Sequence, residues 1–308
     1  MLECHIACYL GDSLGNVTLL KLNLATFRVT PINYIIPFSS SRGTEFETST
    51  NYPIVCILPQ PKIENKRVLL IFSNGFIALW DVKENVAVHS AGATYNRTRP
   101  EKKKVTSGCW VCPIGSKVAI GYSNGELLIF TITPISHEPD FPCRSSSQRT
   151  KLNVGFRTDN IPISLLQWKP MDGKSSRLYV SGASEESSTN MIQIVLLNDQ
   201  TTTRVVKLGL NLSEPCVSME IIGNPMGSNS KNKHELLVVI GKSGRVNAYD
   251  DHAIVRYLLQ SQAKNSSPPP KQVQFGIVQG ESSITAALFL SNNSTLLNFG
   301  EEVWLPQI

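Results

Sequence analysis

Short runs of alternating apolar and polar residues dominate the chain, and this pattern predicts β-strands rather than helices. The clearest phrase is an apolar run, a turn that contains glycine, and a second alternating run. Copies of this phrase occur at Val68–Asp81, Val118–Phe130, Leu236–Asp250 and His5–Leu20. Asn-Gly between two such runs is a strong hairpin signal, because a tight turn there requires positive φ.

The turns supply the first candidate residues. Trp80-Asp81 stands where the Trp-Asp dipeptide closes the third strand of a WD40 blade. We expect Asp81 to serve its turn and the indoles of Trp80, Trp110 and Trp168 to pack in the core. The full set of predicted turn residues is Gly15, Asn74, Gly75, Trp80, Asp81, Asn124, Gly125 and Gly244.

Hairpins recurring every 50 to 60 residues or so predict four-stranded propeller blades with long connections. The predicted hairpins lie near 5–22, 67–82, 117–132, 177–197 and 235–250. Candidate inner strands precede four of them, at 52–58, 105–111, 163–168 and 217–222. The best candidates for outer strands are Thr202–Leu208 and Ile254–Leu259. The prediction is therefore an all-β fold, a WD40-like β-propeller segment of about five four-stranded blades.

We predict one propeller segment over residues 1–308, with inserted loops at 94–104 and 133–150 and a Pro/Ser-rich loop at 261–273. The chain begins on what reads as the second strand of a blade. Ile284–Leu290 reads as the first strand of another blade. We therefore expect an incomplete propeller, because an open arc would leave bare sheet edges.

The blade pattern also resembles a known family. Ile57-Leu58-Pro59 through Asp81-Val82, and Gly182-Ala183-Ser184 through Asp250, resemble the first WD40 propeller of the lethal giant larvae and tomosyn proteins. The loops look closest to plant members, and the likeness covers roughly residues 50–260.

This resemblance implies a non-enzymatic scaffold that binds syntaxin-type SNAREs and regulates vesicle exocytosis. It also implies a cytoplasmic protein, peripheral at the plasma membrane, and myosin II as a partner of some members. The second propeller and the coiled coil of tomosyns do not occur here. A generic WD40 adaptor, such as a ubiquitin-ligase substrate receptor, is the alternative hypothesis.

Composition agrees with a cytosolic protein. The net charge of +5 is mild, so we expect no nucleic-acid binding. The sequence contains no run of about 20 apolar residues and no signal peptide. Its seven scattered cysteines do not suggest a disulfide framework.

Catalytic motifs are weak, and we predict no enzyme activity, no cofactor and no metal site. Cys109-x-x-Cys112 lies in a predicted strand before Pro113, whereas a redox CxxC needs a helix N-terminus. Ile240–Gly244 resembles the end of a P-loop but lacks the earlier glycine and continues as a strand. The five histidines show no close ligand spacing.

One basic run suggests a contact surface. It contains Arg97, Arg99, Lys102, Lys103 and Lys104. The alternatives are a solvated loop, or a contact with an acidic partner or anionic membrane, worth about 1 kcal/mol per basic residue. The segment 142–150 mixes serines with basic residues, so phosphorylation there is a further hypothesis against that of an unmodified loop.

Overall fold

The structure is a computed structural model, and it describes only part of the chain. The described residues are 5–23, 26, 28–38, 52–61, 66–92, 103–132, 148–157, 160–171, 174–183, 190–198, 205–223, 235–264, 268–277 and 283–284. The chain divides into two compact units, residues 1–215 with 255–268, and residues 216–254 with 269–308.

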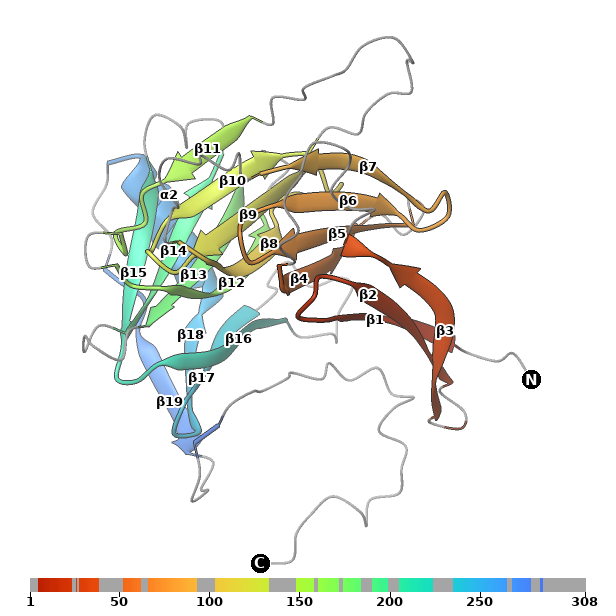
Figure 1. Cartoon of the computed structure of the whole chain (residues 1–308). Helices are drawn as coiled ribbons and strands as arrows, with labels where there is room; N and C mark the ends of the chain where they lie inside the picture. Colours follow the sequence, from red (N-terminus) through yellow and green to blue (C-terminus); the bar gives the residue numbers. More distant parts are fainter. Residues whose placement is uncertain are drawn as a thin grey trace, which may run out of the picture. The chain divides into compact units, whose positions relative to one another are not determined.

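The first unit holds four antiparallel sheets in which each strand pairs with the next along the chain (Figure 1). Sheet A contains β1 (His5–Gly11), β2 (Val17–Asn23) and β3 (Arg28–Ile36). Sheet B contains β4 (Ile54–Pro59), β5 (Arg67–Phe72), β6 (Ile77–Asp81) and β7 (Val86–Ala91).

The other two sheets of this unit repeat the same meander. Sheet C contains β8 (Val105–Trp110), β9 (Lys117–Tyr122), β10 (Leu127–Thr131) and β11 (Arg149–Leu152). Sheet D contains β12 (Ile163–Pro170), β13 (Ser176–Ala183), β14 (Asn190–Leu197) and β15 (Val206–Leu212). Such four-stranded meanders are the building blocks of β-propellers.

Sheet E lies in the second unit. It contains β16 (Cys216–Gly223), β17 (Glu235–Gly241), β18 (Arg245–Asp250) and β19 (Gln272–Ile277). Helix α2 (Asp251–Gln262) follows β18. The prediction of an all-β fold with about five blade-like sheets is confirmed, and four of the five sheets have four described strands.

Neighbouring sheets of the first unit face each other across apolar clusters. Between sheets A and B the cluster includes Val17, Ile36, Phe72 and Trp80, all at most 2% exposed. Between B and C it consists of Leu69, Ile71, Ile77, Leu79, Val88, Val105, Val118, Ile120, Tyr122, Phe130 and Ile132. Between C and D it centres on Leu127, Ile163, Leu178, Val180 and Val195. Burying one large apolar side chain contributes about 1.5–3 kcal/mol, so these faces hold the sheets together.

Hydrogen bonds also join successive sheets through their hairpin turns. The amide of Ile54 at the start of β4 donates to the Asp12 carbonyl, and that of Val105 at the start of β8 donates to the Ser73 carbonyl. In sheet C, the hydroxyl of Ser107 donates to the Ile163 carbonyl of β12 at 2.9 Å. Each first strand is thereby positioned by the preceding sheet.

One predicted strand is wrong. Ile254–Leu259 was expected as an outer strand, but it lies in α2, and β19 is the strand that pairs with β18. The Asp250 carboxylate accepts the His252 amide at 2.9 Å, which caps the first turn of the helix. Asp251, Ile254 and Leu258 are buried at the spacing of three and four typical of a helix.

Two predicted loop boundaries also shift. Helix α2 extends to Gln262 and β19 begins at Gln272, so the connection is shorter than the predicted loop at 261–273. Strand β11 begins at Arg149, within the predicted loop at 133–150. The predicted outer strand at 202–208 overlaps β15, which begins at Val206. Most of the predicted strand Ile284–Leu290 lies outside the described residues.

Candidate functional site

The hairpin turns share one hydrogen-bonded design. In sheets B and C, the Asn74 side-chain oxygen accepts the Phe76 amide at 3.0 Å, and that of Asn124 accepts the Glu126 amide at 3.2 Å. In sheet A the side-chain acceptor is Asp12, two turn positions earlier than the asparagine, and its carboxylate accepts the Asn16 amide at 2.7 Å. The side chains thus satisfy amides that the tight turn leaves unpaired.

The glycines of these turns adopt the left-handed conformation. The φ angles are +89° at Gly15, +88° at Gly75, +72° at Gly125 and +87° at Gly244. An added Cβ at Gly15 would lie 2.7 Å from the Tyr52 carbonyl oxygen, so the position is restricted by backbone as well as by φ.

Beside the turn of sheet C, the end of the predicted basic run takes part in an ion-pair network. The Lys103 ammonium lies 2.8 Å from the Glu126 carboxylate, whose other oxygen pairs with Lys151 at 2.6 Å. The same ammonium lies 5.0 Å from the centre of the Tyr122 ring. Although burial raises it, the pKa of Glu126 is lowered overall by its hydrogen bonds to the two lysines.

Of the other residues in the basic run, only Lys104 is described. Lys104 is exposed, and its backbone amide donates to the Ser123 hydroxyl at 3.0 Å. Arg97, Arg99 and Lys102 lie outside the described residues. Contact of this run with anionic lipid or an acidic partner therefore stays a prediction.

On sheet B, the Trp80-Asp81 pair joins the core to an exposed turn. The Trp80 indole is 2% exposed and donates to the Tyr34 hydroxyl at 2.9 Å, which in turn donates to the Val82 carbonyl. The Asp81 carboxylate accepts the amides of Lys83 and Glu84, each at 3.1 Å. Trp80 therefore packs inside, and Asp81 holds the turn that follows.

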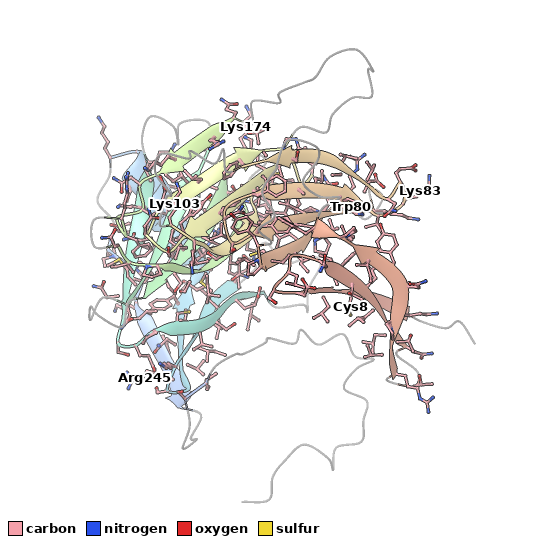
Figure 2. The ribbon with its side chains drawn as sticks, in the orientation of Figure 1. Cys8, Trp80, Lys83, Lys103, Lys174 and Arg245 are labelled. Carbon is pink, nitrogen blue, oxygen red and sulfur yellow. The ribbon has the colours of Figure 1, made fainter. Side chains whose placement is uncertain are left out.

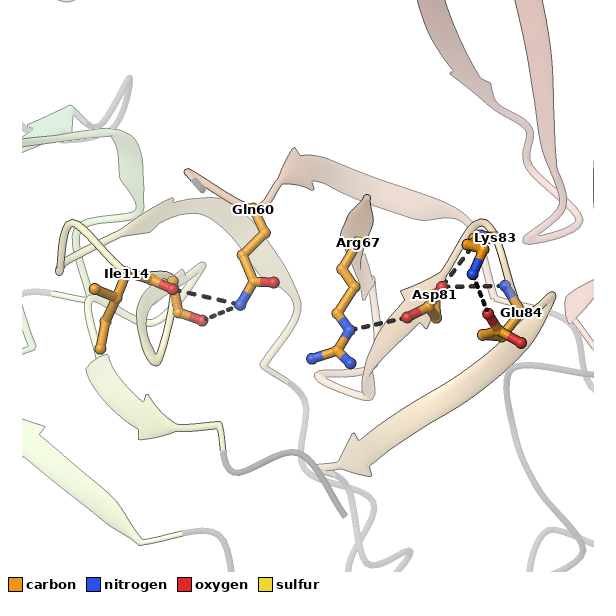
Figure 3. Close-up of polar contacts among 7 residues, drawn as sticks. Gln60, Arg67, Asp81, Lys83, Glu84 and Ile114 are labelled. Atoms are coloured by element: carbon orange, nitrogen blue, oxygen red, sulfur yellow. Dashed lines mark hydrogen bonds and ion pairs between the residues drawn. The ribbon is translucent and has the colours of Figure 1, made fainter. Parts of the chain in front are cut away.

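Two further polar contacts lie on sheet B and at its junction with sheet C (Figure 3). The Arg67 guanidinium pairs with Asp81 at 3.0 Å. The Gln60 side-chain amide donates to the Gly115 carbonyl at 2.9 Å, which connects the β4–β5 turn of sheet B to the β8–β9 turn of sheet C.

We name this surface the B–C rim. It comprises the two contact groups of Figure 3, which are Arg67, Asp81, Lys83 and Glu84 on sheet B, and Gln60 with Ile114 where turns of sheets B and C meet.

The B–C rim presents both charge and apolar surface. Ile114 is 50% exposed. The side chains of Lys83 and Glu84 are 73% and 61% exposed, and Figure 2 shows Lys83 at the periphery of sheet B. Although burial raises it, the pKa of Asp81 is lowered overall by the Glu84 amide and Arg67, so this carboxylate stays charged at neutral pH and keeps its bonds to Arg67 and the turn.

The cysteines of the CxxC pair have separate roles. Cys109 lies in β8 against the apolar core, and burial raises its pKa to about 12. Cys112 lies in the turn after β8, where its sulfur accepts the amides of Ser116 and Lys117 at 2.9 and 3.1 Å. Both thiols are free, and the pair offers no helix N-terminus to activate either one.

Other chemistry is sparse within the described residues. No group of three or more His, Cys, Asp or Glu among them is arranged to hold a metal ion. No helix in the described part combines the length and the apolar character needed to cross a bilayer.

Comparison with known proteins finds similarity only among solved structures. No family model and no curated protein matches the sequence. The β-propeller domain of Cps50 (Swd1) from Myceliophteria thermophila is 11% identical with a TM-score of 0.48, over 80% of this chain and 64% of that chain. Sqt1 from Chaetomium thermophilum is 17% identical with a TM-score of 0.48, over 79% and 52%. The WD40 domain of Toxoplasma gondii coronin is 13% identical with a TM-score of 0.41, over 76% and 52%.

This chain thus spans between 52% and 64% of the length of those three structures. At such identities and TM-scores the likeness carries no argument about function. The resemblance to the lethal giant larvae and tomosyn family stays a prediction.

The sequence analysis missed every member of the B–C rim except Asp81. Gln60, Arg67 and Ile114 belong to no motif; the register of β5 with β6 brings Arg67 to Asp81, and the packing of sheets B and C brings Gln60 to Gly115. One signal was present for Ile114, an isoleucine inside a Pro-Ile-Gly-Ser turn where polar residues are usual.

Proposed function

We propose that this protein is a non-enzymatic scaffold that binds other proteins through the B–C rim. The observation that carries the proposal is the hydrogen bond from Gln60 to Gly115, which joins turns of sheets B and C beside exposed Ile114, together with the exposed charged turn of Lys83 and Glu84 on sheet B. Strands anchor the turns that carry most of the rim residues, which limits the backbone entropy lost on binding. The rim thus offers an apolar group at Ile114 and charged groups at Lys83 and Glu84, and protein interfaces use both kinds.

The finer proposal is that the partner is a syntaxin-type SNARE and that binding regulates vesicle exocytosis at the plasma membrane. Its support is the sequence resemblance over roughly residues 50–260. A ribosomal protein N-terminus is the partner named for one structurally similar propeller, Sqt1.

An affinity capture from cytosol and membrane extract tests both levels. We expect the wild-type chain to recover plasma-membrane syntaxins and Ile114→Asp to lose at least ten-fold of that signal, because a charge replaces an apolar contact. Ile222→Asp is the matched control, since Ile222 is 43% exposed on sheet E and lies outside the rim.

The outcomes separate the two proposals. The wild-type chain could recover ubiquitin-ligase subunits without syntaxins, with a signal that Ile114→Asp still reduces. That result would support the scaffold proposal and reject the exocytosis function. Equal recovery by wild type and Ile114→Asp would reject the B–C rim as the binding surface.

A further inference from the structure

The turn that carries Ile114 also carries a lysine. Residues 111–117 lead from β8 into β9, and Lys117 follows Ile114 by three positions. Hydrogen bonds hold this turn, because the Cys112 sulfur accepts the Ser116 and Lys117 amides and the Gly115 carbonyl accepts the Gln60 side chain. Lys117 itself is exposed, and within the described part of the chain no carboxylate pairs with its ammonium.

The corresponding turn of sheet D lies at the same end of the neighbouring sheet. Val111 after β8 and Trp168 near the end of β12 pack in one apolar cluster, which brings the two turns to one level. Lys169 lies opposite Arg177 in the register of β12 with β13. Lys174 is exposed in the turn between these strands (Figure 2).

The sequence of this end shows the same excess of positive charge when every residue is counted. The two turns with their flanking strand ends, residues 111–117 and 168–178, hold four basic residues against one acidic residue, Asp172. The outer loops at this end, 131–149 and 197–206, are balanced, with three basic and three acidic residues between them. We name the basic surface the C–D basic end, which consists of Lys117, Lys169, Lys174 and Arg177.

Sheet B shows how differently the B–C rim is charged. There Arg67 pairs with Asp81 at 3.0 Å, and Lys83 pairs with Glu84 at 3.2 Å. The positive charges of the rim are thus matched within the chain, whereas the C–D basic end has an excess of three, four basic residues less one acidic. Charge complementarity therefore assigns an anionic group to the C–D basic end.

The depth of the four side chains favours a polypeptide over a membrane. Lys117 and Lys174 are exposed, but Lys169 is half-buried and Arg177 is only 4% exposed. A flat lipid surface contacts the side chains that protrude, whereas carboxylates on a flexible chain also reach a recessed ammonium. The buried guanidinium of Arg177 adds to the positive potential of this end.

We propose that the C–D basic end binds acidic side chains of the same partner polypeptide that contacts the B–C rim. The inference rests on the proposed scaffold function and gives the partner a defined chemistry, an apolar residue close to a run of Asp and Glu. The apolar residue meets Ile114, and the acidic run meets Lys117 and then Lys174. Such charge pairing sets the direction of the bound segment and speeds its association.

A fluorescent peptide, Leu-Ile-Gly-Glu-Asp-Glu-Asp-Gly-Ile-Leu, is the probe, and anisotropy follows its binding to the full chain. Apolar residues at both ends allow either direction of binding. In the matched peptide Gln and Asn replace Glu and Asp, which removes the charge and keeps the shape. We expect the acidic peptide to bind at least about five-fold more tightly, and to weaken as salt is added because exposed ion pairs are screened.

Two double variants locate the acidic peptide. Lys117→Glu with Lys174→Glu should weaken its binding at least about five-fold, because two attractions become repulsions. Lys104→Glu with Lys264→Glu changes the net charge equally and should stay within about two-fold. Both control lysines are exposed, and Lys104 precedes β8 at the opposite end of sheet C.

Three results would overturn the inference. They are equal binding of the two peptides, equal losses for the two double variants, and binding to phosphatidylserine vesicles without binding to the acidic peptide. The affinity capture described above separates this inference from the scaffold proposal. Loss of the partner with Ile114→Asp but not with Lys117→Glu and Lys174→Glu would reject only the C–D basic end, and no loss with either would reject both surfaces.

Discussion

The hydrogen bond between Trp80 and Tyr34 gives the sharpest test of how sheets A and B are joined. Trp80→Phe removes the donor of the 2.9 Å bond and leaves the Tyr34 hydroxyl bonded to Val82. A neutral buried hydrogen bond contributes about 1 kcal/mol. The smaller ring leaves roughly 40 Å³ of space, which adds about 1 kcal/mol at ~24 cal/mol per Å³. We therefore expect a loss of about 2 kcal/mol in the free energy of unfolding.

Trp110→Phe is the matched control. The Trp110 indole donates to the Pro59 carbonyl at 2.8 Å but is only half-buried, so water replaces the lost donor. Its expected cost is below about 1 kcal/mol. Urea unfolding followed by far-ultraviolet circular dichroism measures both variants, with an unchanged m-value as the sign of a pure stability effect. Equal costs for the two variants, or a cost under 0.5 kcal/mol or so for Trp80→Phe, would refute this reasoning.

Three further predictions follow from the same contacts. The folded-state pKa of Glu126 lies below its ordinary value, so its ion pairs stabilise the fold above about pH 4.5. This contribution is lost as the pH falls through the folded pKa. In the wild type the melting temperature should therefore fall below pH 5 or so, and Glu126→Gln should make that fall shallower. Gly15→Ala should lower the free energy of unfolding in urea more than Gly75→Ala does. At Gly15 the new Cβ would lie 2.7 Å from a backbone carbonyl oxygen, whereas at Gly75 its nearest neighbour is a tyrosine hydroxyl at 3.3 Å. Burial raises the pKa of Cys109 to about 12. Iodoacetamide at pH 7.5 should therefore label exposed Cys8 in the folded protein and Cys109 only after unfolding, which mass spectrometry measures. Equal labelling rates for the two cysteines would contradict this.

The sequence predicted the hairpins because their signal is local. Asn74-Gly75 and Asn124-Gly125 specify turns whose φ angles and side-chain bonds need no distant partner. The same holds for Trp80-Asp81, where the aspartate binds amides two and three residues away. Repetition of such local signals was enough to predict the five sheets.

Helix α2 shows where local reading failed. The apolar run Ile254–Leu259 contains β-branched and aromatic residues that favour strands. The helix forms because Asp250 caps its first turn and because its buried positions recur every three or four residues, at Asp251, Ile254 and Leu258. This burial outweighs the strand propensity of the individual residues. The proline-rich stretch before β19 predicted a loop, so β19 was not predicted as the outer strand of sheet E.

The B–C rim was beyond sequence reading for a different reason. Gln60 and Gly115 are far apart in the chain, and their contact depends on how two sheets pack. Pairing of Arg67 with Asp81 depends on the register of β5 with β6. Non-local contacts of this kind leave no pattern in a single sequence. The basic run did stand out in the sequence, but its Lys103 forms an ion pair with Glu126 of the same chain.

Site-specific photo-crosslinking tests the central claim of protein binding through the B–C rim most directly. A photoreactive amino acid replaces Ile114 in one sample and Ile222 in another, and each chain is irradiated in membrane extract. The account predicts a discrete crosslinked partner from position 114, identified by mass spectrometry as a syntaxin, and none from position 222. Crosslinks of equal yield at both positions, or none at 114 while affinity capture still succeeds, would contradict it.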